Sequence, residues 1–251
     1  MITISSVLLT NRVGEENVNA QGYLMKIIEY NRADDIKIKF QDENGAIVNN
    51  CYANFKKGLI RNPFHKSLCG VGFIGNFNGF ASHEKSYKYW ESMINRCYAE
   101  CSLKKAETYR DCVVCEEWLC FVNFHKWFLE NYYEIDGETM NLDKDILVKN
   151  NRLYSPKTCV FVPHKINMAI VNKKASRGKL PVGVQYREKT RKHYCAYLAG
   201  RLGYFDTPIE AFYCYKKAKE TELKNMADQY KDLIPKNLYD ALLNYKIEVD
   251  D

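Results

Sequence analysis

Hydrophobic and polar residues alternate early in the chain, which predicts strands. Within residues 36–40, two isoleucines and a phenylalanine alternate with two lysines, the two-residue period of a strand with one solvent-facing side. Residues 23–30 are rich in Ile and Tyr, and the Asp-Glu-Asn-Gly run at 42–45 is a turn signal. We therefore expect a small antiparallel β domain over residues 1–62, in which no pattern points to catalysis.

The period becomes helical further on, after a glycine-punctuated stretch at residues 64–82 that we expect to be a linker packed by aromatic side chains. Residues 87–101 carry Trp90, Met93 and Cys97 at helical spacing, which predicts one helix. A second helix is expected over residues 116–132, with an aromatic face typical of a core. Its members are Trp118, Phe121, Phe124, Trp127 and Phe128.

The remaining chain alternates short strand patterns with helices. Residues 142–167 predict two short strands around a loop, then a helix that starts near Pro163. A later helix is expected to begin with Thr207 as its N-cap and Pro208 in its first turn. The other expected elements are strands at 182–186, 193–198 and 202–205, and helices at 208–223, 225–232 and 235–245.

These patterns predict an α+β protein of three segments. We expect a small β-rich domain at 1–62, a central ββα domain with flanking helices at 63–172, and a three-stranded antiparallel sheet with helices at 173–251.

Positive charge is concentrated in the third segment. The 251-residue chain has a formal charge of only +6, but residues 173–201 hold nine basic side chains and a single acid, Glu188. Such a stretch is typical of phosphate binding, although a solvated surface is the plain alternative. The basic residues are Lys173, Lys174, Arg177, Lys179, Arg187, Lys189, Arg191, Lys192 and Arg201.

One face of the predicted C-terminal sheet must pack on the following helix, which leaves the other face for solvent or a partner. A twisted sheet of this size fits the major groove of DNA, where Arg reads guanine edges and Lys holds phosphates. Basic hairpin turns that only aid solubility are the alternative. The expected outward side chains are Arg187, Lys189, Arg191, Lys192, Tyr197 and Arg201.

Residues 183–220 resemble the APETALA-type domain of plant ethylene-response factors and of many phage proteins. The resemblance rests on the opening Gly-Val, the basic first turn, the Leu-Gly-Tyr-Phe-Asp-Thr run at 202–207, and a helix opened by Glu210-Ala211 that carries Tyr215. It implies duplex DNA binding through the three-stranded sheet. Several strand positions commonly held by Arg or Trp in plant members are Tyr or Cys here, so no sequence preference is carried over.

The middle of the chain resembles phage-encoded HNH homing-type endonucleases. The matching residues run from the Trp-x-x-Met-x-x-Arg-Cys-Tyr pattern at 90–98, through Leu-Asp at 142–143 and Tyr-Ser-Pro at 154–156, to Asn167. Such nucleases fold as two strands and a helix around one divalent metal ion, and a histidine activates water.

The family's catalytic pattern is incomplete here. Its Asp-His pair falls on Asp143 and Lys144, and a lysine with an ordinary pKa is a poor base at neutral pH. Burial that lowered this pKa would be needed, or His164 as a substitute base. Its middle Asn falls near Thr158. Asp143, Asp145 and Asn167 are the candidate oxygen ligands for Mg²⁺ or Mn²⁺. The catalytic candidates are thus Asp143, Lys144 and His164, and a degenerate scaffold is the alternative.

The ten cysteines favour buried thiols in a reducing compartment, since the N-terminus lacks a signal-peptide pattern and no stretch is apolar enough to span a membrane. Cys97, Cys101, Cys112 and Cys115 could alternatively form a structural zinc site, which the position of Cys97 on a buried helix face disfavours.

The leading expectation is a phage or mobile-element protein that binds duplex DNA in the cytoplasm of a bacterial host and carries a degenerate nuclease domain. An active metal-dependent homing or nicking endonuclease is the enzymatic alternative. The third is an interaction factor that blocks a host complex through a protein partner bound by the N-terminal domain.

Overall fold

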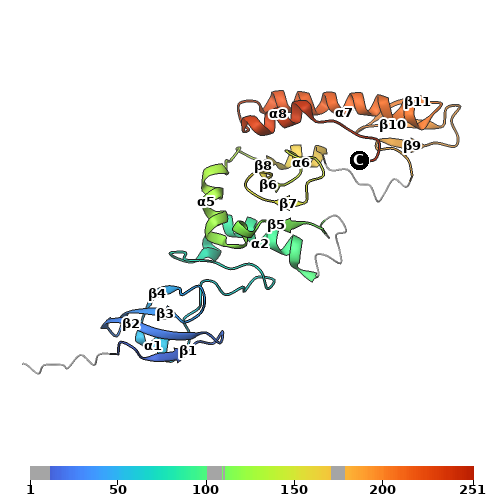
Figure 1. Cartoon of the computed structure of the whole chain (residues 1–251). Coiled ribbons are helices and arrows are strands. Elements are labelled where there is room, and N and C mark those ends of the chain that lie inside the picture. The colour runs from blue at the N-terminus through green and yellow to red at the C-terminus, as the bar shows by residue number, and fades with distance from the viewer. Residues whose placement is uncertain (1–11, 101–108, 110, 171–178) are drawn as a thin grey trace, which may run out of the picture. The chain divides into compact units, whose positions relative to one another are not determined.

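The protein is α+β, as expected: a computed structural model shows helices and strands in both of its compact units, Met1–Leu129 and Glu130–Asp251 (Figure 1). The division into three segments stays a prediction. Within the described part of the chain, no helix is long and apolar enough to cross a membrane. The structure describes residues 12–100, 109, 111–170 and 179–251.

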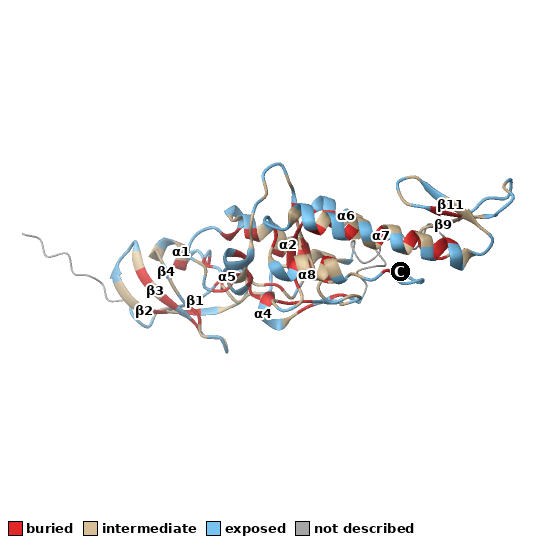
Figure 2. Ribbon diagram, turned by 90° about the horizontal axis from the view of Figure 1, so that it is seen from above, coloured by how far each residue is buried: buried red, intermediate tan, exposed pale blue. Residues whose placement is uncertain are grey.

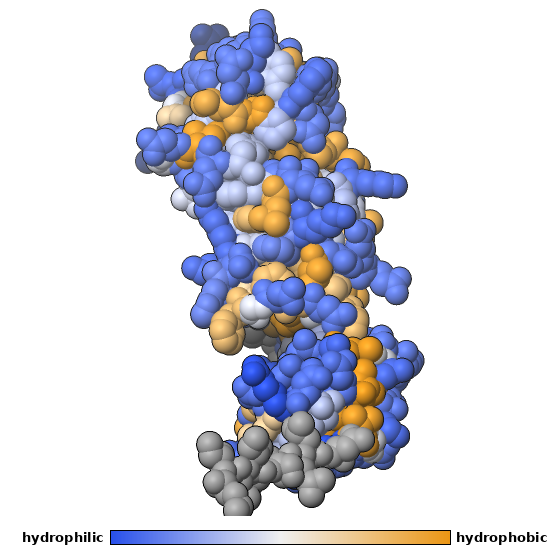
Figure 3. All heavy atoms as spheres, turned by 90° about the vertical axis from the view of Figure 1, so that its left-hand side faces the viewer, coloured by the Kyte–Doolittle hydropathy of each residue, from blue (hydrophilic) through white to orange (hydrophobic). Residues whose placement is uncertain are grey.

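The first unit begins with a four-stranded antiparallel sheet in the order β1-β2-β3-β4. Its strands are β1 (Glu16–Val18), β2 (Leu24–Arg32), β3 (Asp35–Phe40) and β4 (Ile47–Asn50). The predicted alternation is confirmed, because Ile36, Ile38 and Phe40 are buried against Phe55 of α1 (Tyr52–Lys56). Several apolar side chains of the sheet remain exposed, and Figure 3 shows apolar surface among polar surface on the N-terminal part. Examples are Val18, Leu24 and Ile47.

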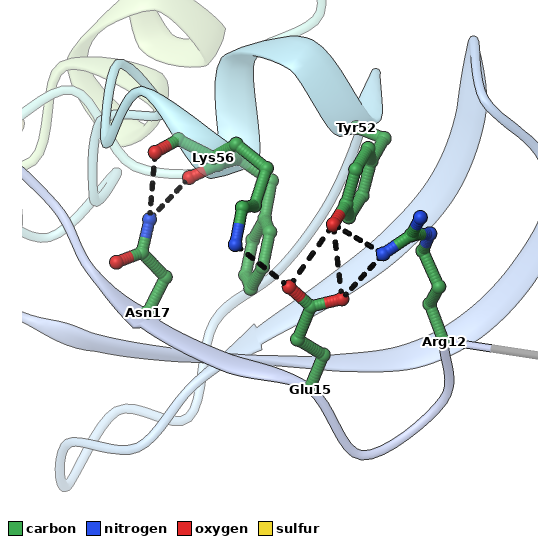
Figure 4. A network of polar contacts seen from close by, with 6 residues as sticks. Arg12, Glu15, Asn17, Tyr52 and Lys56 are labelled. Carbon is green, nitrogen blue, oxygen red and sulfur yellow. Dashed lines mark hydrogen bonds and ion pairs between the residues drawn. The ribbon is translucent and has the colours of Figure 1, made fainter.

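A polar network attaches α1 to the strand edge (Figure 4). The Glu15 carboxylate accepts a hydrogen bond from the Tyr52 hydroxyl at 3.1 Å and forms ion pairs with Lys56 at 3.2 Å and Arg12 at 3.3 Å. Burial opposes ionisation of Glu15, but these three partners outweigh it and lower its pKa. Asn17 donates to the carbonyl oxygen of Phe55 at 2.6 Å, at the end of α1. These contacts hold α1 against the sheet, so the network has a structural role.

The expected helix over 116–132 is wrong as a single element, because it is broken at Cys120. The break arises from a long-range contact: the backbone N–H of Phe73 donates to Leu119 O, and that of Phe121 donates to Phe73 O. Gly75 lies so close that an added Cβ would be 2.7 Å from the Cys120 Sγ. The helical elements among the described residues of this region are η1 (Ala81–His83), α2 (Lys85–Tyr98), α4 (Glu116–Leu119) and α5 (Phe121–Asn131), with the short strand β5 (Val113–Val114).

The second unit starts with a ββα arrangement, as predicted. Strands β6 (Met140–Asp143) and β8 (Val160–Pro163) pair antiparallel, with Asp143 opposite Val160, and α6 (His164–Ile170) follows directly. The short strand β7 (Leu153–Tyr154) lies in the loop between them.

One helix, α7 (Pro208–Tyr230), contributes buried side chains to two hydrophobic cores of this unit (Figure 2). The expected break near residue 224 is wrong, because Leu223 and Ala227 continue a buried stripe. Leu223 packs in the core of the C-terminal sheet, while Ala227 packs with β8, α6 and α8 (Lys236–Asn244). The predicted Thr207 cap is confirmed, since its side chain accepts a hydrogen bond from the Glu210 N–H.

Candidate nucleic-acid interface

The C-terminal sheet has the order β11-β10-β9, with strands β9 (Val184–Tyr186), β10 (Tyr194–Tyr197) and β11 (Arg201–Phe205). Its inner face packs on α7 through Val184 and Ala196, which lie against Phe212 in one core. Alternation along β10 sends Cys195 to the opposite face, where its register partners are Gln185 and Tyr204. α7 therefore covers one face of the sheet, and around the other face Cys195 is buried while Arg187, Tyr197 and Arg201 are exposed.

Two arginines flank the central row of this outer face. The Arg187 guanidinium donates to the Gln185 side-chain oxygen at 2.6 Å. Arg201 lies over the Tyr204 ring at 5.3 Å from its centroid and donates to the Tyr204 hydroxyl at 3.4 Å. The two arginines are thus held near the sheet surface while their side chains stay exposed. Side chains ordered in this way lose less conformational entropy on binding than freely moving ones.

The basic turn between β9 and β10 is braced by one threonine. The Thr190 hydroxyl lies 2.9 Å from Arg187 O and 2.7 Å from Lys192 O, so it links the two ends of the turn. Lys192 also forms an exposed ion pair with Asp206 at 2.8 Å. Exposed pairs contribute little stability, so a phosphate can displace Asp206 from Lys192 at low energetic cost.

All six side chains expected on the outer surface of this module are exposed: Arg187, Lys189, Arg191, Lys192, Tyr197 and Arg201. Sequence reasoning missed Gln185 and Tyr204, which strand pairing places beside Cys195. The two-residue spacing of Gln185 from Arg187 was the available signal for the first. Lys173, Lys174 and Arg177 lie outside the described residues.

The acidic residues of the ββα arrangement gather in the turn after β6. Asp143 Oδ1 accepts hydrogen bonds from the backbone N–H groups of Asp145 at 2.9 Å and Ile146 at 2.8 Å. Burial first, and then repulsion from the Asp145 carboxylate, raise the pKa of Asp143 to about 6, although the two backbone hydrogen bonds oppose the shift. Burial raises the pKa of Tyr245, and the carboxylates of Asp251, Asp145 and Asp143 add to the shift in that order. Asp143 and Asp145 thus form a close pair of carboxyl groups.

Lys144, which the sequence analysis aligned with a histidine base, is buried beside this pair. Its Nζ is 3.1 Å from Asp145 Oδ2 and 5.8 Å from the centroid of the Tyr154 ring. An ammonium held by a carboxylate has no lone pair with which to accept a proton. The geometry therefore favours a structural ion pair over general-base catalysis at this position.

The other residues that the sequence analysis assigned to a nuclease site are His164, Thr158 and Asn167. The backbone N–H of His164 donates to Thr139 O at 2.8 Å, at the start of β6. The His164 ring contacts Asn141 at 3.0 Å. Thr158 donates to Leu153 O at 2.7 Å, and Asn167 lies one turn further along α6.

The residues of this turn do not fit a divalent metal centre as they stand. One Asp145 oxygen is paired with an ammonium, and one Asp143 oxygen accepts two backbone hydrogen bonds. A divalent ion about 4 Å from that ammonium would be repelled by roughly 8 kcal/mol at an effective dielectric of about 20. Within the described ranges, no group of three or more His, Cys, Asp or Glu side chains is arranged to hold a metal ion.

The four cysteines considered for zinc are described only in part, because Cys101 lies outside the described residues. Cys97 and Cys112 are buried, and burial raises the pKa of Cys115. Of the nine described cysteines, five are buried, as expected for thiols in cores.

Comparisons of the chain with family models and curated proteins, and of its structure with solved structures, found no match.

Proposed function

We propose that the protein binds duplex DNA through the outer face of the β9–β11 sheet. The observation that carries this proposal is the gathering of exposed basic side chains on the face and turn of a sheet whose other side is buried by α7. A duplex offers closely spaced phosphates along its grooves, and lysine and arginine side chains supply the matching charge.

The arginines and lysines have different roles in this proposal. Arg187, directly after β9, and Arg201, at the start of β11, lie beside Gln185 and Tyr204, where planar guanidinium groups can approach base edges in the major groove. Lys189 and Lys192 lie in the turn, where they reach phosphates. The resemblance to APETALA-type domains, which rests on residues 183–220, independently supports the same face.

The ββα arrangement is proposed to be a degenerate nuclease domain that acts as a scaffold. The supporting observation is that the Lys144 ammonium, which stands where these nucleases have a histidine base, is paired with Asp145. The active endonuclease remains the enzymatic alternative, and the plasmid assay in the Discussion distinguishes the two.

The test is fluorescence anisotropy of the full chain with a labelled duplex that carries its preferred site, obtained by selection from random duplexes. The Arg187→Ala/Arg201→Ala variant is compared with Lys217→Ala/Lys224→Ala, which removes two exposed lysines from α7. We expect the arginine variant to lose at least tenfold in affinity and the lysine variant to match the wild type. Equal affinities for both variants and the wild type would refute binding through the sheet.

A further inference from the structure

Lys144 is a buried cation that is fixed at both of its ends. Its side chain is only 10% exposed, and its Nζ forms the 3.1 Å ion pair with Asp145 while lying near the Tyr154 ring. Its backbone oxygen accepts a hydrogen bond from the Asn151 side chain at 2.7 Å. A lysine is seldom buried without a charged partner, so its placement here requires Asp145.

The two neighbouring carboxyl groups have a matching need for positive charge. Asp143 Oδ1 accepts hydrogen bonds from the backbone N–H groups of Asp145 and Ile146, which holds both carboxyl groups in one tight turn where they repel each other when ionised. In proteins, such repulsion is relieved by a proton, a metal ion or a side-chain cation. Lys144 is the cation that this turn provides itself.

We propose that the Lys144 ammonium is the counter-cation of Asp145 and prevents a divalent metal ion from binding at the Asp143–Asp145 turn. Lys144 is thus a positioning residue: it holds Asp145 and supplies the charge that Mg²⁺ or Mn²⁺ would otherwise supply. Lysine at the position of the histidine in the resembling nucleases therefore has two effects. The catalytic base is lost, and the positive charge that a metal ion would supply is already present. This inference is independent of DNA binding by the sheet.

The test is a Mn²⁺ titration of the full chain followed by electron paramagnetic resonance, which distinguishes free from bound ion. We expect wild type and Lys144→Arg to bind Mn²⁺ no more tightly than Asp145→Asn does. Lys144→Gln, which removes the charge, should bind Mn²⁺ at least tenfold more tightly than wild type. A merely structural role of Lys144 would not produce that gain, and the arginine variant keeps the charge as a control.

Two results would overturn the proposal: Mn²⁺ binding by wild type that is lost in Asp145→Asn, or an affinity of folded Lys144→Gln equal to that of wild type. If Lys144→Gln does not fold, Lys144→Met keeps an unbranched stem beside Tyr154 without the charge and is held to the same outcomes. Adding a chelator separates this proposal from the proposed function, since duplex binding by the sheet should not change in its presence.

Discussion

Gly183 lies directly under the ring of Tyr215, and the sheet can meet α7 only because residue 183 lacks a side chain. A Cβ built on Gly183 would be 2.1 Å from Tyr215 Cγ and Cδ2, and the residue has a φ of +72°. The Gly183 carbonyl also accepts a hydrogen bond from the Tyr197 N–H at 2.9 Å. The contact thus links the start of β9, the end of β10 and the first half of α7.

Replacing this glycine should therefore loosen the whole C-terminal sheet. We expect Gly183→Ala to destabilise the second unit by about 2 kcal/mol or more, since overpacking and a left-handed backbone conformation each have a cost of this order. Gly200→Ala is the matched control, because no atom lies within 4 Å of its added Cβ. Urea unfolding followed by circular dichroism measures the change, and hydrogen exchange should localise it to residues 183–205. Equal unfolding midpoints for the two variants would contradict the packing argument.

The buried carboxyl of Asp143 predicts a specific pH dependence of stability. Its pKa is raised from an ordinary 3.8 to about 6, so the folded protein holds this proton more tightly than the unfolded chain does. Stability should consequently fall as the pH rises from about 4 through 6, and the full loss should persist above that window.

Asp143→Asn should remove this loss while its oxygen still accepts the two backbone hydrogen bonds. We expect the variant to be more stable than wild type at pH 7.5, by up to about 3 kcal/mol, and to show no gain at pH 4. Thermal unfolding across this pH range is the measurement, with the exposed Asp232→Asn as control. A gain that is as large at pH 4 as at pH 7.5 would exclude ionisation of Asp143 as the cause.

If the ββα arrangement is a degenerate nuclease, the purified protein with Mg²⁺ or Mn²⁺ should leave supercoiled plasmid intact. The physical reason is that Lys144, which stands where these nucleases have a histidine base, is paired with Asp145, and the His164 ring contacts Asn141. Agarose electrophoresis of the plasmid is sufficient to test this. Nicking that disappears in Asp143→Ala would instead establish the enzyme.

The cysteines near the end of α2 should act as thiols. We expect no stoichiometric zinc in the purified protein, because Cys112 is buried and burial of Cys115 opposes the thiolate form that zinc requires. Elemental analysis by mass spectrometry provides the count. About one zinc per chain, lost in Cys112→Ser or Cys115→Ser, would show that these residues form a metal site with Cys101.

The sequence predicted correctly those helices and strands that are determined by residues adjacent in the chain. The alternation at residues 36–40 and the Thr207-Pro208 helix start both correspond to observed elements, since each depends on neighbouring residues alone. The break at Cys120 escaped prediction because it depends on pairing with Phe73, nearly fifty residues away. A helix was expected to end at Leu223 and another to begin at Asn225, although Leu223 and Ala227 on either side of this break are buried in two different cores of one helix.

The candidate sites show the same limit. The exposed basic side chains could be identified from charge and alternation, but not the position of Gln185 and Tyr204 beside Cys195, which depends on strand register. The motif at residues 143–145 indicated metal ligands, and it did not reveal that the middle lysine is buried and paired with its neighbour. Burial of a charged residue depends on the whole turn and leaves no local pattern.

The salt dependence of duplex binding tests the central claim most directly. Each lysine that neutralises a phosphate releases counterions, so affinity of the full chain should fall steeply with salt. Lys189→Gln and Lys192→Gln should weaken binding to all sequences alike and each reduce the slope of log affinity against log salt by about one unit. Arg187→Ala and Arg201→Ala should instead cost about 1–3 kcal/mol on a preferred site and little elsewhere. Lys224→Gln, on the exposed side of α7, is the matched control and should leave the slope unchanged. Slopes that are the same for wild type, Lys189→Gln, Lys192→Gln and the α7 control would contradict phosphate binding by the sheet module.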